Sequence, residues 1–202
     1  MAAGKKHTLV IYNRTMDRLW RGVLFLGLEL FGLWWFRGAW TGFYRPELDP
    51  LLLGAAGYTT ALGVFAFLAR RMAYVRAFDD FFLVASPFYR FKTSYQRIRG
   101  LRAVDFHRLF DLEKLSWSEE RYVRPMIGAT VVVIRLTDYP VSTGLMGAFF
   151  HRYLVSPKDT ELVLLVPKWM DLSVELDSRY NEYRQRKRRR MSIGGFQRGS
   201  AG

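Results

Sequence analysis

Two apolar stretches near the amino terminus dominate the hydrophobic pattern of the chain. The more apolar of the two is Pro50–Ala69 (PLLLGAAGYTTALGVFAFLA). It has 20 residues without a charged side chain, and Arg70 and Arg71 follow it directly. A helix rises about 1.5 Å per residue, so a stretch of this length matches the roughly 30 Å hydrocarbon core of a bilayer. Asp49 suits the N-cap of such a helix and Pro50 its first position. The pattern predicts a transmembrane helix over 50–69.

A second apolar and aromatic stretch, Leu19–Trp40, precedes this helix and is interrupted by Arg21, Glu29 and Arg37. Arg21 and Arg37 lie near its ends, where long cationic side chains can reach the lipid headgroups. Tryptophan, which recurs near both ends, is typical of membrane interfaces. We therefore expect an earlier transmembrane helix over about 19–40. The two helices would form an antiparallel hairpin within residues 19–71.

The charges around the two stretches predict an orientation. Lysine and arginine predominate in the N-terminal segment 1–18 and directly after residue 69, whereas the connection 37–49 carries two basic and two acidic residues. Short flanks rich in lysine and arginine stay in the cytoplasm. We expect a multi-pass protein of the inner (plasma) membrane, with both termini in the cytoplasm and the connection outside. The absence of cysteine agrees with a cytoplasmic main domain.

The net charge of +13 is not spread evenly. Residues 72–183 hold fifteen basic and fourteen acidic residues, so this segment is nearly neutral. Residues 184–202 hold seven basic residues and no acidic one. The excess of positive charge therefore belongs to the membrane flanks and to a basic C-terminal tail, which we expect to be disordered.

The pattern of residues 72–183 predicts a strand-rich domain long enough to bury its own core. Ala73–Phe78 and Phe81–Ser86 flank Asp79 and Asp80, as in a tight β-hairpin. Further strands are predicted at Tyr89–Tyr95, Ile98–Phe106, Thr130–Leu136 and Glu161–Val166. Residues 107–128 read as a partly helical insertion, with Ser116 or Ser118 as a helix start.

The period of the apolar residues changes after Asp171. Leu172, Leu176, Tyr180 and Tyr183 recur at steps of three and four, which predicts an amphipathic helix with Asp171 as its N-cap.

Two segments carry a resemblance to a known family. The hairpin AYVRAFDDFFLV (73–84) and the phrase SYQRIRGLRAVDF (94–106), placed after two apolar helices, resemble the bacterial pleckstrin-homology-like (PH-like) membrane proteins. The resemblance implies a mainly-β soluble domain of two antiparallel sheets, closed at one end by a C-terminal helix. The expected fold class is thus a membrane α-hairpin plus a PH-like domain. The insertion 107–128 and the long loop 137–160 exceed the family pattern and leave the strand count open.

Basic side chains are the candidate binding residues. Phosphoinositide-binding PH domains of eukaryotes use lysine and arginine around the first hairpin loop, whereas the loop here holds Asp79 and Asp80. A phosphoinositide site of that kind is not expected. Contact with anionic lipid or another polyanion is instead assigned to Arg70, Arg71, Arg90, Lys92, Arg97, Arg99, Arg102, Arg184, Arg186, Lys187, Arg188, Arg189 and Arg190. The competing interpretations are a solvated strand face and a solubilising tail, with nucleic acid as the rival polyanion and not the expected partner.

Glu29 falls near the middle of the predicted first helix. A carboxylate at that depth is costly and by default suggests function. Packing is the favoured interpretation, in which Glu29 is protonated or bonded to Tyr58, Thr59 or Thr60 on the second helix. Small residues of that helix, Gly54, Gly57 and Ala61, would permit close approach within the hairpin or to another subunit.

No motif predicts catalysis. The chain has no cysteine, and His7, His107 and His151 lack the spacing of metal ligands. Phosphate-binding loops, nucleophile elbows and zinc patterns are absent from the sequence. We therefore expect a non-enzyme without catalytic, cofactor or metal residues.

The expected function is that of a membrane-anchored binding module that recognises a protein partner and touches anionic lipid. The alternative is an accessory or assembly subunit of a larger membrane complex.

Overall fold

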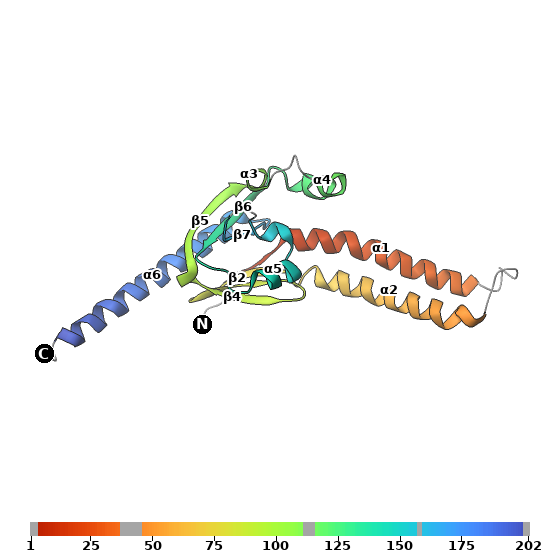
Figure 1. The fold of residues 1–202 in the computed structure, drawn as a ribbon, viewed down its shortest axis with the longest axis horizontal. Helices are drawn as coiled ribbons and strands as arrows, with labels where there is room; N and C mark the ends of the chain where they lie inside the picture. Colours follow the sequence, from red (N-terminus) through yellow and green to blue (C-terminus); the bar gives the residue numbers. More distant parts are fainter. Residues whose placement is uncertain (1–3, 37–45, 111–115, 157–158, 200–202) are drawn as a thin grey trace. The chain divides into compact units, whose positions relative to one another are not determined.

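The computed structural model describes residues 4–36, 46–110, 116–156 and 159–199 (Figure 1). The chain divides into two compact units. One contains residues 11–73 and is helical. The other combines residues 1–10 with residues 74–202 and holds every strand that the structure describes.

The helical unit consists of α1 (Val10–Trp35), the short 3-10 helix η2 (Pro46–Leu48) and α2 (Asp49–Ala69). Helix α2 coincides with the predicted 50–69 span and, within the described ranges, is the one helix long and apolar enough to cross a membrane. Its N-cap is Leu48 and not Asp49, which lies in the first turn beside Pro50.

Helix α1 differs from its prediction at both ends. It begins at Val10, nine residues before Leu19, and therefore includes Arg14, Asp17 and Arg18 as well as Arg21 and Glu29. These charges explain why α1 does not qualify as an apolar span, so a second membrane crossing remains a proposal. The predicted end of this span at 37–40 and most of the connection 37–49 lie outside the described residues.

Close contacts join α1 and α2 as a helical hairpin. A Cβ on Gly27 would lie 2.6 Å from Thr60 Oγ1, and one on Gly63 would lie 3.1 Å from the backbone of Leu24. Glycine at these two positions lets the helices approach closely. Gly54 and Gly57 do not lie at the contact between α1 and α2, because a Cβ on either would meet no atom within 4 Å. The hairpin contact thus uses other glycines than those singled out from the sequence.

The base of the hairpin is fixed by polar contacts. Arg70 Nη1 lies 3.0 Å from Asp17 Oδ1, to which the indole nitrogen of Trp20 also donates a hydrogen bond of 3.2 Å. Met16, Ala66 and Ala69 form a small buried cluster beside Trp20. Of the charged residues that lengthen α1, Asp17 therefore has its partner at the end of α2.

The other unit is a mainly-β domain of two antiparallel sheets with a C-terminal helix, as expected. Sheet A has the order β1 (Lys6–Thr8), β2 (Tyr74–Ala77), β3 (Phe81–Ala85) and β4 (Arg90–Ser94). Sheet B has the order β5 (Ile98–Asp105), β6 (Thr130–Leu136) and β7 (Glu161–Leu164). Within the described residues the domain thus has seven strands.

Several strands agree with the sequence pattern. Strands β2 and β3 pair around Asp79 and Asp80, with Ala77 opposite Phe82. In β4 the exposed and buried positions alternate as predicted, with Phe91 and Thr93 buried. Strand β6 has the predicted bounds.

Short helices occupy the connection between the two sheets and the connections within sheet B. They are η3 (Tyr95–Arg97), α3 (Phe106–Leu109), α4 (Trp117–Val123), η5 (Arg124–Met126), α5 (Thr143–Phe149) and η6 (Arg152–Leu154). Ser116, one of the two predicted helix starts, forms a capping box with Glu119 at the start of α4. The insertion 107–128 is therefore partly helical in its described part, whereas the helix α5 in the loop 137–160 was not predicted.

Strand β1 is the element that the sequence pattern did not reveal. It pairs with β2 so that Thr8 lies opposite Tyr74, although 65 residues separate these two in the chain. The predicted N-terminal segment 1–18 is thus divided between a strand of sheet A and the first turns of α1. The helical hairpin is an insertion between two paired strands.

Helix α6 (Trp169–Gly199) closes the domain. Leu172 and Leu176 are fully buried against the sheets, which confirms the predicted apolar face. The helix begins two residues before Asp171, so Asp171 lies in its first turn. It also continues well past Tyr183 as a single rod (Figure 1), where the sequence led us to expect a disordered tail.

Candidate functional site

Sheet A has two chemically different ends. The α-helical insertion leaves after Thr8 and returns before Tyr74, and these two residues are register partners. We call this the attachment end. Strands β2 and β3 are joined at Asp79 and Asp80 at the opposite end, which we call the turn end. Strand spacing of about 3.3 Å per residue separates Tyr74 from Asp79 by roughly 17 Å.

The carboxylates of the turn end are paired with cations of α6. Arg179 Nη1 lies 2.6 Å from Asp79 Oδ1, and Arg186 Nη1 lies 3.2 Å from Asp80 Oδ1. Arg186 also donates a hydrogen bond to the backbone oxygen of Asp79. These contacts fix α6 to the turn end. Arg186, one of the predicted contact residues, is therefore occupied by the domain itself.

A hollow of about 260 Å³ lies beside these ion pairs, between η3 and α6. We call it the tyrosine pocket. It is lined by Tyr95, Gln96, Ile98, Tyr180, Tyr183, Arg184, Lys187 and Arg188. Three of these residues, Arg184, Lys187 and Arg188, were predicted from the sequence to contact an anion. The structure places the rings of the three tyrosines beside them, and we call these rings the floor of the pocket.

Hydrogen bonds hold two rings of this floor. Tyr95 is fully buried, and its hydroxyl donates to the backbone oxygen of Phe78 at 2.8 Å. Burial raises the pKa of Tyr95, an effect that the nearby Arg179 partly offsets. The hydroxyl of Tyr180 donates to the backbone oxygen of Ile98 at 3.2 Å. Two rings of the floor are thus anchored to the backbone.

The third ring, that of Tyr183, lies 6.0 Å from the ring of Tyr95. The guanidinium of Arg184 stands 5.5 Å from the ring centre of Tyr180, as in a cation–π contact. Tyr180, Tyr183, Arg184 and Lys187 follow one another at the i, i+3, i+4 and i+7 positions of α6. This helical spacing extends across residue 183, so it was readable from the sequence once the helix is continued into the basic tail.

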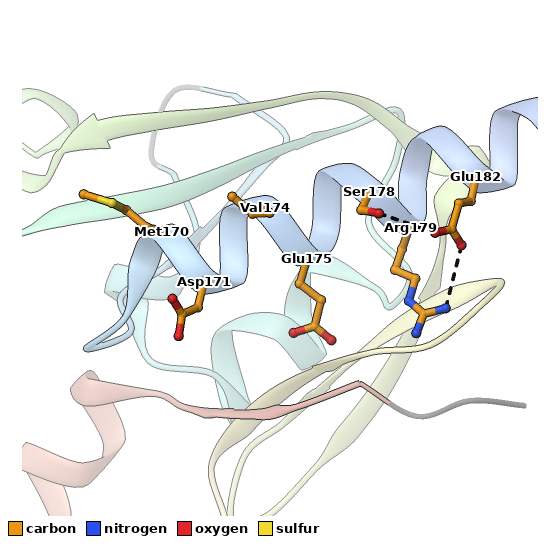
Figure 2. A pocket seen from close by; sticks show the side chains of 7 residues that line it. All are labelled: Met170, Asp171, Val174, Glu175, Ser178, Arg179 and Glu182. Carbon is orange, nitrogen blue, oxygen red and sulfur yellow. Dashed lines mark hydrogen bonds and ion pairs between the residues drawn. The ribbon is translucent and has the colours of Figure 1, made fainter.

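A second hollow, of about 530 Å³, follows α6 closer to its start (Figure 2). We call it the acidic groove; its lining residues are Met170, Asp171, Val174, Glu175, Ser178, Arg179 and Glu182. Figure 2 shows Asp171 and Glu175 extending toward the segment that holds β1. Glu175 Oε2 lies 2.9 Å from Nε2 of the buried His7, and Asp171 lies 3.7 Å from Lys5 Nζ. These acids join β1 to α6, which is a structural role.

The remaining predicted cations are dispersed. Arg90 and Lys92 are exposed on β4, and Arg99 donates to the Thr137 hydroxyl at 3.3 Å. Arg97 donates to the backbone oxygen of Tyr139 at 3.4 Å. Arg102 lies 2.9 Å from the carboxylate of the buried Glu161.

In the helical unit, Arg70 is paired with Asp17, while Arg71 is exposed. Arg189 is exposed on α6, and only the backbone of Arg190 is described. The predicted cations therefore do not form one surface.

Glu29 is exposed on α1. The predicted bonds to the second helix are not formed within the described residues, because the hydroxyl of Thr59 donates to Ala55 and Ala56 of its own helix. Gly27, two residues before Glu29, faces α2, which places Glu29 on the opposite side of α1.

The histidines have structural surroundings. The ring of His151 lies 5.4 Å from that of Tyr122 and 5.3 Å from that of Tyr153, and the two tyrosine rings lie 6.2 Å from each other, so the three rings form one cluster. Burial, and then the charge of Arg152, lower the pKa of His151. Within the described ranges, no group of three or more His, Cys, Asp or Glu side chains could hold a metal ion.

Comparisons of the chain with family models, with curated proteins and with solved structures give no match.

Proposed function

We propose that this chain is a non-catalytic, membrane-anchored binding module with a PH-like domain, placed at the cytoplasmic face of a bacterial inner membrane. In this proposal both α1 and α2 cross the bilayer, and the domain binds a protein partner. Basic residues next to the anchor touch anionic lipid.

The observation that carries the proposal is the position of the helical hairpin between β1 and β2. Because Thr8 and Tyr74 are opposite each other, two short connections tie the hairpin to one end of sheet A. The apolar α2 supplies a span of 21 residues, close to the length that a bilayer requires. A domain so attached would stay within a few residues of the membrane surface.

The positions of the charges support different binding roles for the two ends of the domain. Arg70 and Arg71 follow α2 directly, and Arg90 begins β4 at the attachment end, since its register partner Ala85 also faces Tyr74. Arg70 is paired with Asp17, so the exposed Arg71 and Arg90 are the proposed lipid contacts, each worth about 1 kcal/mol near an anionic leaflet. Arg184, Lys187 and Arg188 of α6 line the tyrosine pocket at the turn end, where they are available to a different ligand.

The natural absence of cysteine allows a direct test of the topology. Thr41→Cys places a single thiol between the two helices, and Ala103→Cys places one on an exposed position of β5. A membrane-impermeant maleimide should label Thr41→Cys in intact spheroplasts but should label Ala103→Cys only after lysis. Labelling of both thiols from outside would refute the proposed orientation, and release of the chain by alkaline carbonate would refute membrane anchoring.

The alternative, an accessory subunit of a larger membrane complex, is favoured by the exposed Glu29. A carboxylate on the face of α1 away from α2 would gain from a polar partner on another helix. Native mass measurement after gentle detergent extraction separates the two proposals. A stable hetero-complex that Glu29→Leu dissociates would support the subunit, whereas a monomer with either residue would support the binding module.

A further inference from the structure

We propose that the tyrosine pocket binds the phosphoryl group of a small, water-soluble phosphate ester. The inference rests on the proposed function, in which basic residues of the domain bind an anion, and it assigns that anion a place and a chemical class.

The charge of the pocket is unbalanced in its own surroundings. Among the described residues, Arg184, Lys187 and Arg188 form no ion pair with a carboxylate. The nearest acids of the turn end, Asp79 and Asp80, are already engaged by Arg179 and Arg186. Three cations that converge on one hollow without a counter-charge form a site for a compact anion.

The floor of tyrosine rings distinguishes this site from an exposed surface that is only basic. Two of these rings are held by hydrogen bonds to the backbone. The hydroxyl of the partly buried Tyr183 has no such bond within the described residues and can donate to a phosphoryl oxygen. The exposed amide of Gln96 lines the same hollow and offers further donors.

The hollow has room for a small ligand. Its volume of about 260 Å³ is several times the roughly 30 Å³ that one water molecule takes up in the liquid. A phosphoryl group with a small organic group fits this space. The tyrosine rings provide apolar surface for the organic group while the cations bind the charge.

The pocket lies at the turn end of sheet A. Tyr95 follows β4 at the turn end, and its backbone nitrogen donates to the backbone oxygen of Asp80. The attachment end lies roughly 17 Å away along the sheet. The pocket therefore lies at the end of sheet A away from the residues that lead into and out of the helical hairpin.

Titration calorimetry of the full chain in nanodiscs of uncharged phosphatidylcholine tests the proposal, with glycerol 3-phosphate as the probe. The pocket variant Arg184→Gln/Lys187→Gln should weaken binding at least tenfold. Tyr183→Phe, which removes one hydroxyl, should weaken it about threefold. The control Arg121→Gln/Arg124→Gln removes the same charge from exposed positions of α4 and η5 and should change binding less than twofold.

The outcomes are distinguishable from those of the topology experiment. Absence of binding, or equal loss in the pocket and control variants, would overturn the pocket while leaving membrane anchoring intact. Binding to phosphatidylglycerol vesicles without binding to glycerol 3-phosphate would identify a lipid headgroup as the source and overturn the soluble ligand. Single-stranded RNA that binds a hundredfold more tightly than the monoester, with the same loss in the pocket variant, would overturn it in favour of nucleic acid.

Discussion

Glu161 offers the sharpest energetic prediction, because it is a carboxylate buried at the edge of sheet B. Its side chain is 1% exposed and lies 2.9 Å from Arg102 Nη2 and 3.0 Å from Arg135 Nε. The two arginine side chains are about half exposed, at 47% and 51%. The pair of cations therefore neutralises a charge that water cannot reach.

The structure gives different costs for losing one cation and for losing both. Arg102→Met or Arg135→Met alone leaves the carboxylate one partner, and since the lost group was half solvated we expect a cost of about 1 kcal/mol each. The double variant leaves a buried carboxylate without a counter-charge, which costs about 3–5 kcal/mol. The excess over additivity, about 1–3 kcal/mol, is the measurable signature of the shared carboxylate.

Hydrogen–deuterium exchange of the full chain in detergent measures these costs locally. The amides of β6 and β7 should exchange faster by about fivefold in each single variant and by more than a hundredfold in the double variant, following 1.4 kcal/mol per factor of ten. Arg99→Met serves as the control, since Arg99 lies on the neighbouring β5 and donates only to a threonine hydroxyl. Additive single and double effects would refute the reasoning.

Three further predictions concern other parts of the chain. Gly63→Ile should separate α1 from α2 at a cost of about 1–3 kcal/mol, because a Cβ there would lie 3.1 Å from the backbone of Leu24. Cross-linking between cysteines placed on α1 and α2 should then fall. The control Gly54→Ile lies on open surface and should leave the cross-linking unchanged. His7→Ala removes the 2.9 Å contact with an α6 carboxylate, a loss of about 1–3 kcal/mol, and should therefore raise amide exchange in β1 by about fivefold or more. Unchanged exchange would contradict that role. The pKa of His151 is lowered by burial, so the unfolded chain binds its proton more readily and stability should fall as the pH drops below about 6.5. His151→Phe should keep the ring stack and flatten this decline in melting temperature between pH 7.5 and 5.5, and an equal decline in both proteins would argue against it.

The local pattern of the sequence determined those elements whose stability depends on their own residues. In a bilayer, a single stretch of twenty uncharged residues satisfies its own backbone hydrogen bonds as a helix, and α2 has nearly the predicted bounds. The β-branched run of β6 and the alternation of β4 likewise fixed strands and their buried faces. The period of three and four predicted the buried face of α6 through Leu172 and Leu176.

Tertiary structure alone decided the features that depend on residues far apart in the chain. Strand β1 has three residues, too few for a period, and it exists because β2 supplies its hydrogen bonds and Glu175 binds His7. The same long-range pairing makes the helical hairpin an insertion and gives sheet A its two ends. The number of charges in a segment does not distinguish one cation from another. In the fold, however, Arg102 and Arg186 form ion pairs with Glu161 and Asp80, which are distant in sequence. Arg184, Lys187 and Arg188 are left on a tyrosine floor, because only the packing of η3 against α6 brings those rings together.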